Sequence, residues 1–234
     1  MNEITQIRKL SLWIFLIPFL AINICLIISQ NPEFLEKTIF TVDQIGRSGF
    51  SIPYLDGSLS ISRASRTFPQ YLIFKPAMIT TAVLLYYYWK NNNDLINKYK
   101  TTEINYKFKT FGILSAVFLA IHSIFLGIKF DNDLYKLFRR IVMLSFIIFE
   151  LIAQAYLIKF FYEIKNDLED FVNITYLKIK RILITTLIVV SIIILPFLPF
   201  DNFKFLKHAL EWNVFLGVII FYLLTHLMWK KTNS

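Results

Sequence analysis

Residue types and motifs on which many soluble enzymes depend are scarce in this chain of 234 residues. The single cysteine, Cys25, lies inside an apolar run, so the chain forms neither an internal disulfide nor a zinc–thiolate site. Only six glycines occur, and no GxGxxG, P-loop, HExxH or GxSxG motif is found, which argues against phosphate-cradling loops and nucleophile elbows. The three histidines, His122, His208 and His226, show no HxxxH spacing. We therefore expect no metal site and no cofactor.

Apolar residues dominate what is present. Hydrophobic residues make up 56% of the chain and aromatic residues 17%, and the mean hydropathy is +0.55. A soluble domain of this length could not bury so much apolar surface, so a membrane protein is expected. The excess of 25 Lys and Arg over 16 Asp and Glu is typical of residues that flank membrane spans near anionic headgroups, and we expect membrane lipids rather than nucleic acid as partners. The sequence does not indicate a protein partner.

Six apolar segments approach the ~20 residues that a helix needs to cross a bilayer. They predict an all-α polytopic membrane protein, in which six transmembrane helices form one bundle and a single domain covers residues 1–234. Prolines within three of these segments predict kinks, and tryptophans near segment ends are typical of an aromatic belt. The segments are 10–28, 71–89, 110–128, 141–162, 182–200 and 209–229, the prolines are Pro18, Pro76 and Pro196, and the tryptophans are Trp13, Trp89, Trp212 and Trp229.

The distribution of basic residues predicts the orientation. Lysine and arginine are more frequent in the segments that share a side with the N-terminus, so we expect the N- and C-termini to be cytoplasmic. The sequence does not indicate which membrane holds the protein.

A long connection, residues 30–70, is predicted outside the membrane between the first two spans. Its apolar residues suit a partly ordered cap on the bundle, which is the simpler interpretation. It also contains Ser60, Ser62, Arg63 and Arg66, whose hydroxyl and guanidinium donors suit a phosphate, and the phosphate available at a membrane surface is a lipid headgroup. These four residues are our predicted headgroup site.

The connection contains Pro53-Tyr54, Ser60-Ile61-Ser62-Arg63 and Pro69-Gln70-Tyr71, and the last predicted span opens with Glu211-Trp212. In these motifs the chain resembles the Frag/DRAM/Sfk family of six-span membrane proteins, which is related to a GPI-anchor lipid-remodelling factor and to the N-terminal region of the Cwh proteins. Leu59 stands where the GPI branch of that family tends to have proline. The resemblance implies a role in lipid remodelling or distribution and does not itself imply catalysis.

Ionisable residues inside predicted spans are rare and are functional by default. Lys75, His122, Glu150 and Glu211 all fall in the outer half of the bundle under the predicted orientation. We hypothesise that Lys75, His122 and Glu150 face one polar cavity, which opens under the long connection, and that Glu211 lines its entry. Simpler interpretations are that Lys75 extends to the interface, His122 packs in the core and Glu211 caps a helix.

Three functions remain open from the sequence. The leading one is a lipid-handling protein that binds a phospholipid or lipid-anchor headgroup at its outer face. The second is a membrane-embedded acyltransferase or hydrolase, for which His208 and Glu211, on one helical face, or a serine of the connection are the catalytic candidates. The third is a transporter in which Lys75 and Glu150 form an intramembrane pair.

Overall fold

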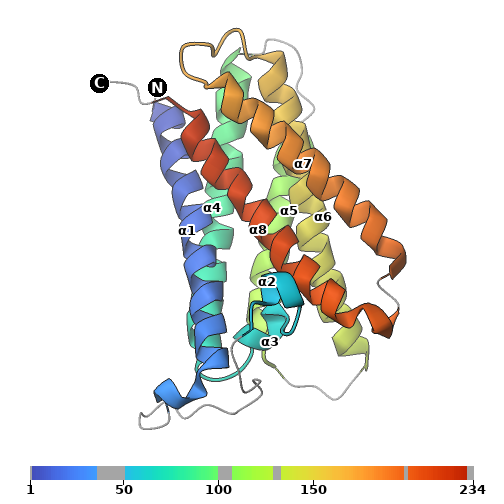
Figure 1. Cartoon of the computed structure of the whole chain (residues 1–234). Coiled ribbons are helices and arrows are strands. Elements are labelled where there is room, and N and C mark those ends of the chain that lie inside the picture. The colour runs from blue at the N-terminus through green and yellow to red at the C-terminus, as the bar shows by residue number, and fades with distance from the viewer. Residues whose placement is uncertain (1, 36–50, 100–106, 129–132, 198–199, 231–234) are drawn as a thin grey trace.

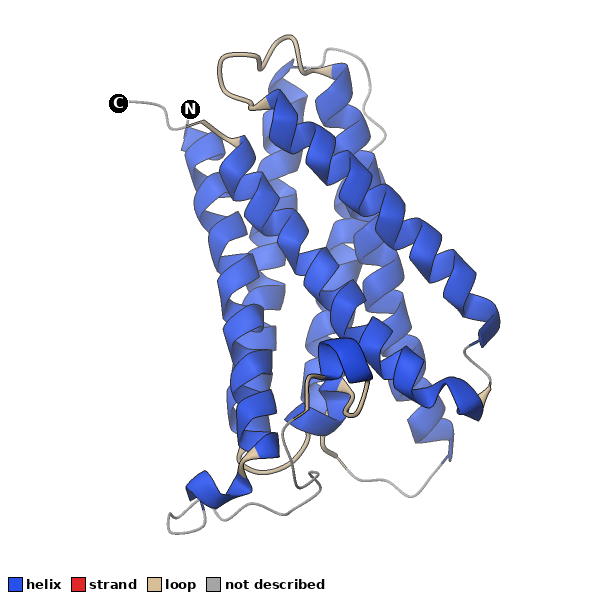
Figure 2. Ribbon diagram, in the orientation of Figure 1, coloured by secondary structure: helices blue, strands red, loops and turns tan. Residues whose placement is uncertain are grey.

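The computed structural model describes residues 2–35, 51–99, 107–128, 133–197 and 200–230, and that part of the chain is built from helices without strands (Figures 1 and 2). Five short helical turns lie in the connections between six long helices: η1 (Pro32–Leu35), α2 (Pro53–Asp56), α3 (Ile61–Ser65), η2 (Leu195–Phe197) and η3 (Asp201–Phe203). The long helices are α1 (Asn2–Gln30), α4 (Gln70–Tyr99), α5 (Lys107–Phe125), α6 (Asp133–Glu163), α7 (Ile174–Ile194) and α8 (Lys204–Met228).

Each predicted apolar segment falls on one of these long helices, because an apolar run of this length has its backbone groups satisfied most simply within a helix. The bounds of the predicted segment 182–200 need correction. The segment expected at 182–200 is wrong at its C-terminal end, since α7 ends at Ile194 and Pro196 lies in the 3-10 turn η2 (Leu195–Phe197). Pro196 therefore follows the helix instead of kinking it, whereas Pro18 and Pro76 do lie inside α1 and α4.

Four of the described helices, α1, α5, α6 and α8, are long and apolar enough to cross a membrane, so the chain has the character of a membrane protein. The other two long helices carry more polar residues. Helix α7 has Lys178, Lys180 and Arg181 in its first half, and α4 has Lys75 and the run 86–88 of tyrosines within its apolar part.

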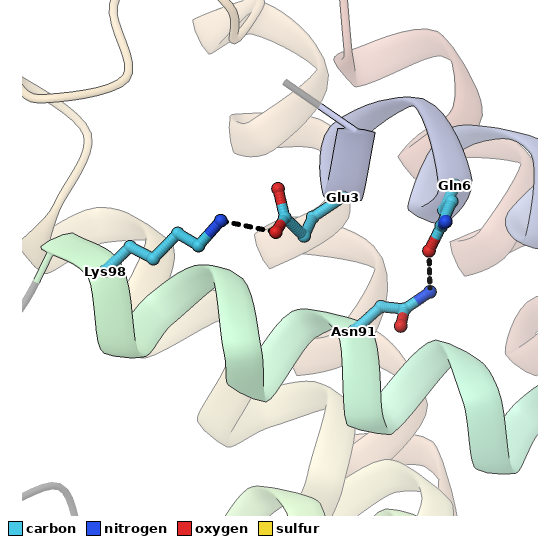
Figure 3. Close-up of polar contacts among 4 residues, drawn as sticks. All are labelled: Glu3, Gln6, Asn91 and Lys98. Carbon is cyan, nitrogen blue, oxygen red and sulfur yellow. Dashed lines mark hydrogen bonds and ion pairs between the residues drawn. The ribbon is translucent and has the colours of Figure 1, made fainter.

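The six long helices form a closed ring. Helix α1 packs against α4, α4 against α5, α5 against α6, α6 against α7, α7 against α8, and α8 returns to α1. The N-terminus and the end of α8 lie at the same end of the bundle (Figure 1). At this termini end, Lys98 of α4 forms an ion pair with Glu3 of α1, and the Asn91 side chain donates a hydrogen bond to Gln6 (Figure 3).

Three of the four tryptophans do not form the expected aromatic belt. Trp89, Trp212 and Trp229 are buried inside the bundle, while Trp13 is 54% exposed. The Trp89 ring fills the space beside Gly112 of α5, where an added methyl group would overlap the indole. These rings therefore hold helices together instead of marking the membrane surface.

Residues 51–69, in the connection between α1 and α4, fold back onto the opposite end of the bundle, which we call the loop end (Figure 1). Residues 51–69 form two short helices, α2 (Pro53–Asp56) and α3 (Ile61–Ser65), which contact α8 and α1. This agrees with the simpler interpretation of a partly ordered cap. The apolar residues expected to contribute from positions 36–50 lie outside the described residues.

Gly57 determines how closely this cap approaches α8. It follows α2 with a φ of +61°, in the left-handed region that favours glycine. A Cβ at this position would lie 1.7 Å from the backbone oxygen of Phe205, so the backbones of the cap and of the start of α8 are in direct contact.

We expect Gly57→Ala to destabilise the protein by ~1–3 kcal/mol, the usual cost of a side chain held in this conformation, with added overlap against Phe205. Thermal unfolding of purified protein in detergent would measure the loss as a lower midpoint. Leu55→Ala is the matched control, because Leu55 is 80% exposed in the same turn. Equal midpoints for the two variants would contradict the contact between the cap and α8.

Candidate functional site

The first turns of α8 hold the cap through hydrogen bonds to its backbone. The indole Nε1 of Trp212 donates to the carbonyl oxygen of Leu59 at 2.8 Å, and the side chain of Asn213 donates to the carbonyl oxygen of Tyr54 at 2.7 Å. The rings of Tyr54 and Trp212 are 4.7 Å apart between centroids. Residues separated by about 150 positions in the sequence thus form one unit at the loop end.

The two predicted catalytic candidates also contact this backbone. His208 Nδ1 lies 3.0 Å from the carbonyl oxygen of Gly57. The carboxylate of Glu211 accepts the backbone N–H groups of Ile61 and Ser62, at the N-terminus of α3, where a negative charge is favourable. Both residues therefore help to hold the cap. Their role in catalysis stays a prediction.

The predicted headgroup residues lie on α3 or directly after it. Ser60 is the N-cap of α3, since its Oγ accepts the backbone N–H of Arg63 at 3.3 Å, and it is buried. Ser62 Oγ lies 3.4 Å from Ser60 Oγ. Ser60 thus has a structural task, while the guanidinium groups of Arg63 and Arg66 have no hydrogen bond or ion pair with any residue that the structure describes.

Arg63 and Arg66 belong to a larger basic cluster. Arg139, in the second turn of α6, is close enough to Arg66 for electrostatic repulsion. The charge of Arg139 also acts on His122 of α5. We call Arg63, Arg66, Arg139 and His122 the loop-end basic cluster. Partial burial, together with the positive charges of Arg63 and Arg139, lowers the pKa of Arg66.

Two nitrogen atoms of the cluster lack hydrogen-bond partners. Arg139 Nε and His122 Nδ1 are both buried, and neither contacts an acceptor in the described part of the chain. Buried polar atoms are normally hydrogen-bonded. Repulsion between neighbouring guanidinium groups is also unfavourable unless an anion lies among them. This arrangement is suited to a ligand with several negatively charged oxygens, such as a phosphate.

Lys75 is not part of a shared cavity with Glu150. Its ammonium group lies at the protein surface, where it donates to the carbonyl oxygen of Ile124 at 3.2 Å and lies 5.5 Å from the centre of the Tyr71 ring. The hypothesis that Lys75, His122 and Glu150 face one cavity therefore needs correction for Lys75. Lys75 agrees better with the simpler interpretation of a lysine that extends to the interface.

Glu150 is fully buried and is surrounded by hydrogen-bond donors. Its carboxylate accepts hydrogen bonds from Ser115 of α5, from Tyr222 of α8 and, at 2.9 Å, from Gln154 one turn further along α6. Gln154 also donates to the carbonyl oxygen of Val218 at 3.3 Å. Glu150 therefore joins three helices of the ring through the donors around its carboxylate, which is how a bundle accommodates a carboxyl group at this depth.

The cavity beside Glu150 is very small. It has a water-accessible volume of about 10 Å³, and that is the space of about one water molecule. It is lined by side chains that include Glu150 and Tyr222, together with apolar residues such as Met78 and Leu119, whereas Lys75, His122 and Glu211 do not line it. The cavity at Glu150 is therefore not the expected one shared with Lys75 and His122.

Lys180 is a buried cation that the sequence reasoning did not single out. Its ammonium group donates to Thr225 Oγ1 at 2.7 Å and lies 3.9 Å from the centre of the Phe221 ring. Tyr88 approaches the same hydroxyl at 3.5 Å. The helical spacing of the sequence indicates this position, because Leu177, Lys180, Ile184 and Leu187 all fall on the buried face of α7.

Comparisons of the chain with models of known protein families, with curated proteins and with solved structures give no match.

We expect Glu150→Ala to destabilise the bundle by roughly 3 kcal/mol, because Ser115, Gln154 and Tyr222 would lose their common acceptor while they stay buried. Glu150→Gln should cost less, since an amide oxygen still accepts. Chemical or thermal unfolding in detergent would give the difference, with the exposed Glu163→Gln as control. If Glu150→Ala unfolds at the wild-type midpoint, the network does not stabilise the bundle.

Proposed function

We propose that this is a six-span membrane protein that binds the phosphate of a lipid headgroup at its loop end, through Arg63, Arg66 and Arg139. The observation that carries the proposal is the loop-end basic cluster, whose guanidinium groups have no carboxylate partner among the described residues. Guanidinium groups bind phosphate oxygens in a bidentate geometry that ammonium groups cannot reproduce. Arg139 joins Arg63 and Arg66 in this proposal because of its buried, unpartnered Nε.

Lipid is the favoured source of the phosphate because of where the cluster lies. Exposed apolar residues such as Leu137, Phe138 and Ile141 surround Arg139 on the outer faces of α6, and such a surface belongs against acyl chains. A headgroup phosphate would then lie at the level of the guanidinium groups. A soluble phosphate compound has no acyl chain to pack against these apolar neighbours.

The proposed topology has six crossings with the N- and C-termini in the cytoplasm. Supporting it, α4 and α7 belong to the same closed ring as the four more apolar helices, and the ends of α1 and α8 lie together (Figure 1). An even number of crossings requires that arrangement. The greater number of basic residues in the connections at the termini end supports the cytoplasmic assignment.

Membership of the Frag/DRAM/Sfk family belongs to the same proposal. The segments that carry the resemblance, Ser60–Arg63 and Glu211-Trp212, are in contact with one another. A role in lipid remodelling or distribution follows from the resemblance if the family holds.

Lipid binding is favoured over the transporter alternative. The cavity at Glu150 accommodates about one water molecule, so a larger solute could pass only if the helices moved apart. It is also favoured over the hydrolase alternative, since His208 and Glu211 are both engaged with the cap backbone.

We expect Arg63→Ala/Arg66→Ala to lose the co-purified phospholipid bound at the loop end, because two charges near the headgroup contribute ~1 kcal/mol each. Native mass spectrometry of the protein released from detergent would count the retained lipids.

A further comparison of Arg139→Gln with Arg140→Gln uses two adjacent arginines, of which Arg140 is exposed. Only the Arg139 variant should lose lipid. Unchanged retention in both arginine variants would contradict the headgroup site.

The proposed orientation predicts which engineered cysteines a membrane-impermeant maleimide reaches in intact cells. In a Cys25→Ser background, Leu55→Cys at the loop end should react, because Leu55 is 80% exposed. Lys165→Cys, in the connection between α6 and α7, should react only after the membrane is permeabilised. Labelling of both positions, or of neither, in intact cells would contradict a topology with the two ends on opposite sides.

A further inference from the structure

A groove between α6 and α7 lies in the half of the bundle that holds the termini, away from the loop-end basic cluster. Its water-accessible volume is about 460 Å³, within the ~300–1,000 Å³ of typical small-molecule sites. It is lined by Ala155, Ile158, Lys159, Tyr162 and Glu163 of α6 and by Arg181, Ile184, Thr185 and Ile188 of α7.

The lining changes from polar to apolar along the groove. The two helices are antiparallel neighbours, so Lys159 and Glu163, near the end of α6, lie at the same level as Arg181, near the start of α7. Ile184 and Ile188 follow deeper in the bundle. At ~1.5 Å per residue, Arg181 and Ile188 are separated by roughly 10 Å along the axis, a distance that fits within one leaflet of a ~30 Å hydrocarbon core.

The polar end of the groove carries a small positive charge. Neither Lys159 nor Arg181 forms an ion pair in the part of the chain that the structure describes. The Arg181 guanidinium lies 5.2 Å from the centre of the Tyr162 ring, which restricts its position at the groove mouth. Lys159 and Arg181 therefore place two cationic groups at this end of the groove, which suits the negative charge of a phosphodiester.

We propose that this groove binds one membrane phospholipid, whose phosphodiester contacts Lys159 and Arg181 and whose acyl chain lies against Ile158, Ile184 and Ile188. The site is separate from the loop-end basic cluster, since it uses different helices at the opposite end of the bundle. It therefore goes beyond the proposed function and does not depend on it. The order of polar and apolar residues excludes a ligand that is polar throughout, such as a free nucleotide.

The test is a titration of the delipidated full chain with dioleoyl phosphatidylglycerol in detergent, followed by native mass spectrometry. Lys159→Ala/Arg181→Ala should weaken binding of one lipid about tenfold or more, since each charge contributes ~1 kcal/mol at the surface. Lys165→Ala/Lys178→Ala is the matched control, because it removes two exposed basic residues at the same end that do not line the groove. An equal loss in the control, or no loss in the groove variant, would overturn the proposal.

A second pair of variants tests the acyl chain. Thr185→Trp fills the groove without changing its charge, and Thr186→Trp places the same side chain on the neighbouring exposed residue outside it. Only Thr185→Trp should weaken lipid binding.

Competition by millimolar inorganic phosphate as strong as that by lipid would assign the site to free phosphate. A lipid-independent dimer that Thr185→Trp converts to monomer would assign the groove to a second copy of the chain, and either result would overturn the lipid proposal.

The loop-end variant Arg63→Ala/Arg66→Ala separates the two proposals in the same titration. It should leave groove binding unchanged, because its residues lie at the other end of the bundle. If it abolishes all lipid binding while Lys159→Ala/Arg181→Ala has no effect, the groove proposal fails and the loop-end proposal stands. The opposite pattern would leave the groove as the lipid site and refute the loop-end proposal.

Discussion

The loop end depends on how the backbone of the cap satisfies its hydrogen bonds. Short helices such as α2 and α3 leave many N–H and C=O groups without intrahelical partners, and close to a bilayer there is little water to replace them. The first turns of α8 supply those partners, with Trp212 donating to Leu59 and Glu211 accepting from Ile61 and Ser62. Because α3 is held in this way, Arg63 and Arg66 do not need ion pairs of their own to fix α3.

The buried residues Glu150 and Lys180 are stabilised in different ways. Glu150 is surrounded by hydroxyl and amide donors from Ser115, Tyr222 and Gln154, and Lys180 by the Thr225 hydroxyl and an aromatic face. Tyr222 and Tyr88, one from each neighbourhood, are in edge contact at 4.9 Å between ring centroids. The bundle therefore has a polar strip through its core, which joins α4, α5, α6, α7 and α8, while its outer surface is rich in aliphatic side chains.

Much of the helical layout could be predicted from the sequence, because the length of an apolar run directly limits the structures that satisfy its backbone. The arrangement of side chains around each helix could not. Depth along the helix was used to pair Lys75 with Glu150, but depth does not give the direction in which a residue faces. Lys75 faces the surface beside Ile124, whereas Lys180, in the second turn of α7, faces the core.

The cap illustrates the same limit. Serines and arginines at short spacing suggested one binding motif, yet within α3 they have separate tasks: Ser60 caps the helix, and the arginine side chains extend from it. Arg139 joined the cluster only through the packing of α6, and its neighbour Arg140 is exposed. A single sequence does not distinguish these two adjacent arginines, because their environments differ by the ~100° turn between consecutive helical residues.

The same ~100° rotation between consecutive residues explains how α7 contacts both the core of the bundle and the groove. Lys180 points inward, where its contacts with Thr225 and Phe221 tie the first turns of α7 to α8, and its position 5.7 Å from the Phe161 ring centre adds a contact with α6. Arg181 is the next residue and points to the groove, beside Tyr162. The buried residues of α7 are Leu177, Lys180, Ile184 and Leu187, whereas Ile192 and Ile193 near its C-terminal end are well exposed. The buried lysine thus determines where the adjacent arginine is presented, and a substitution at Lys180 would act on the groove through the position of α7.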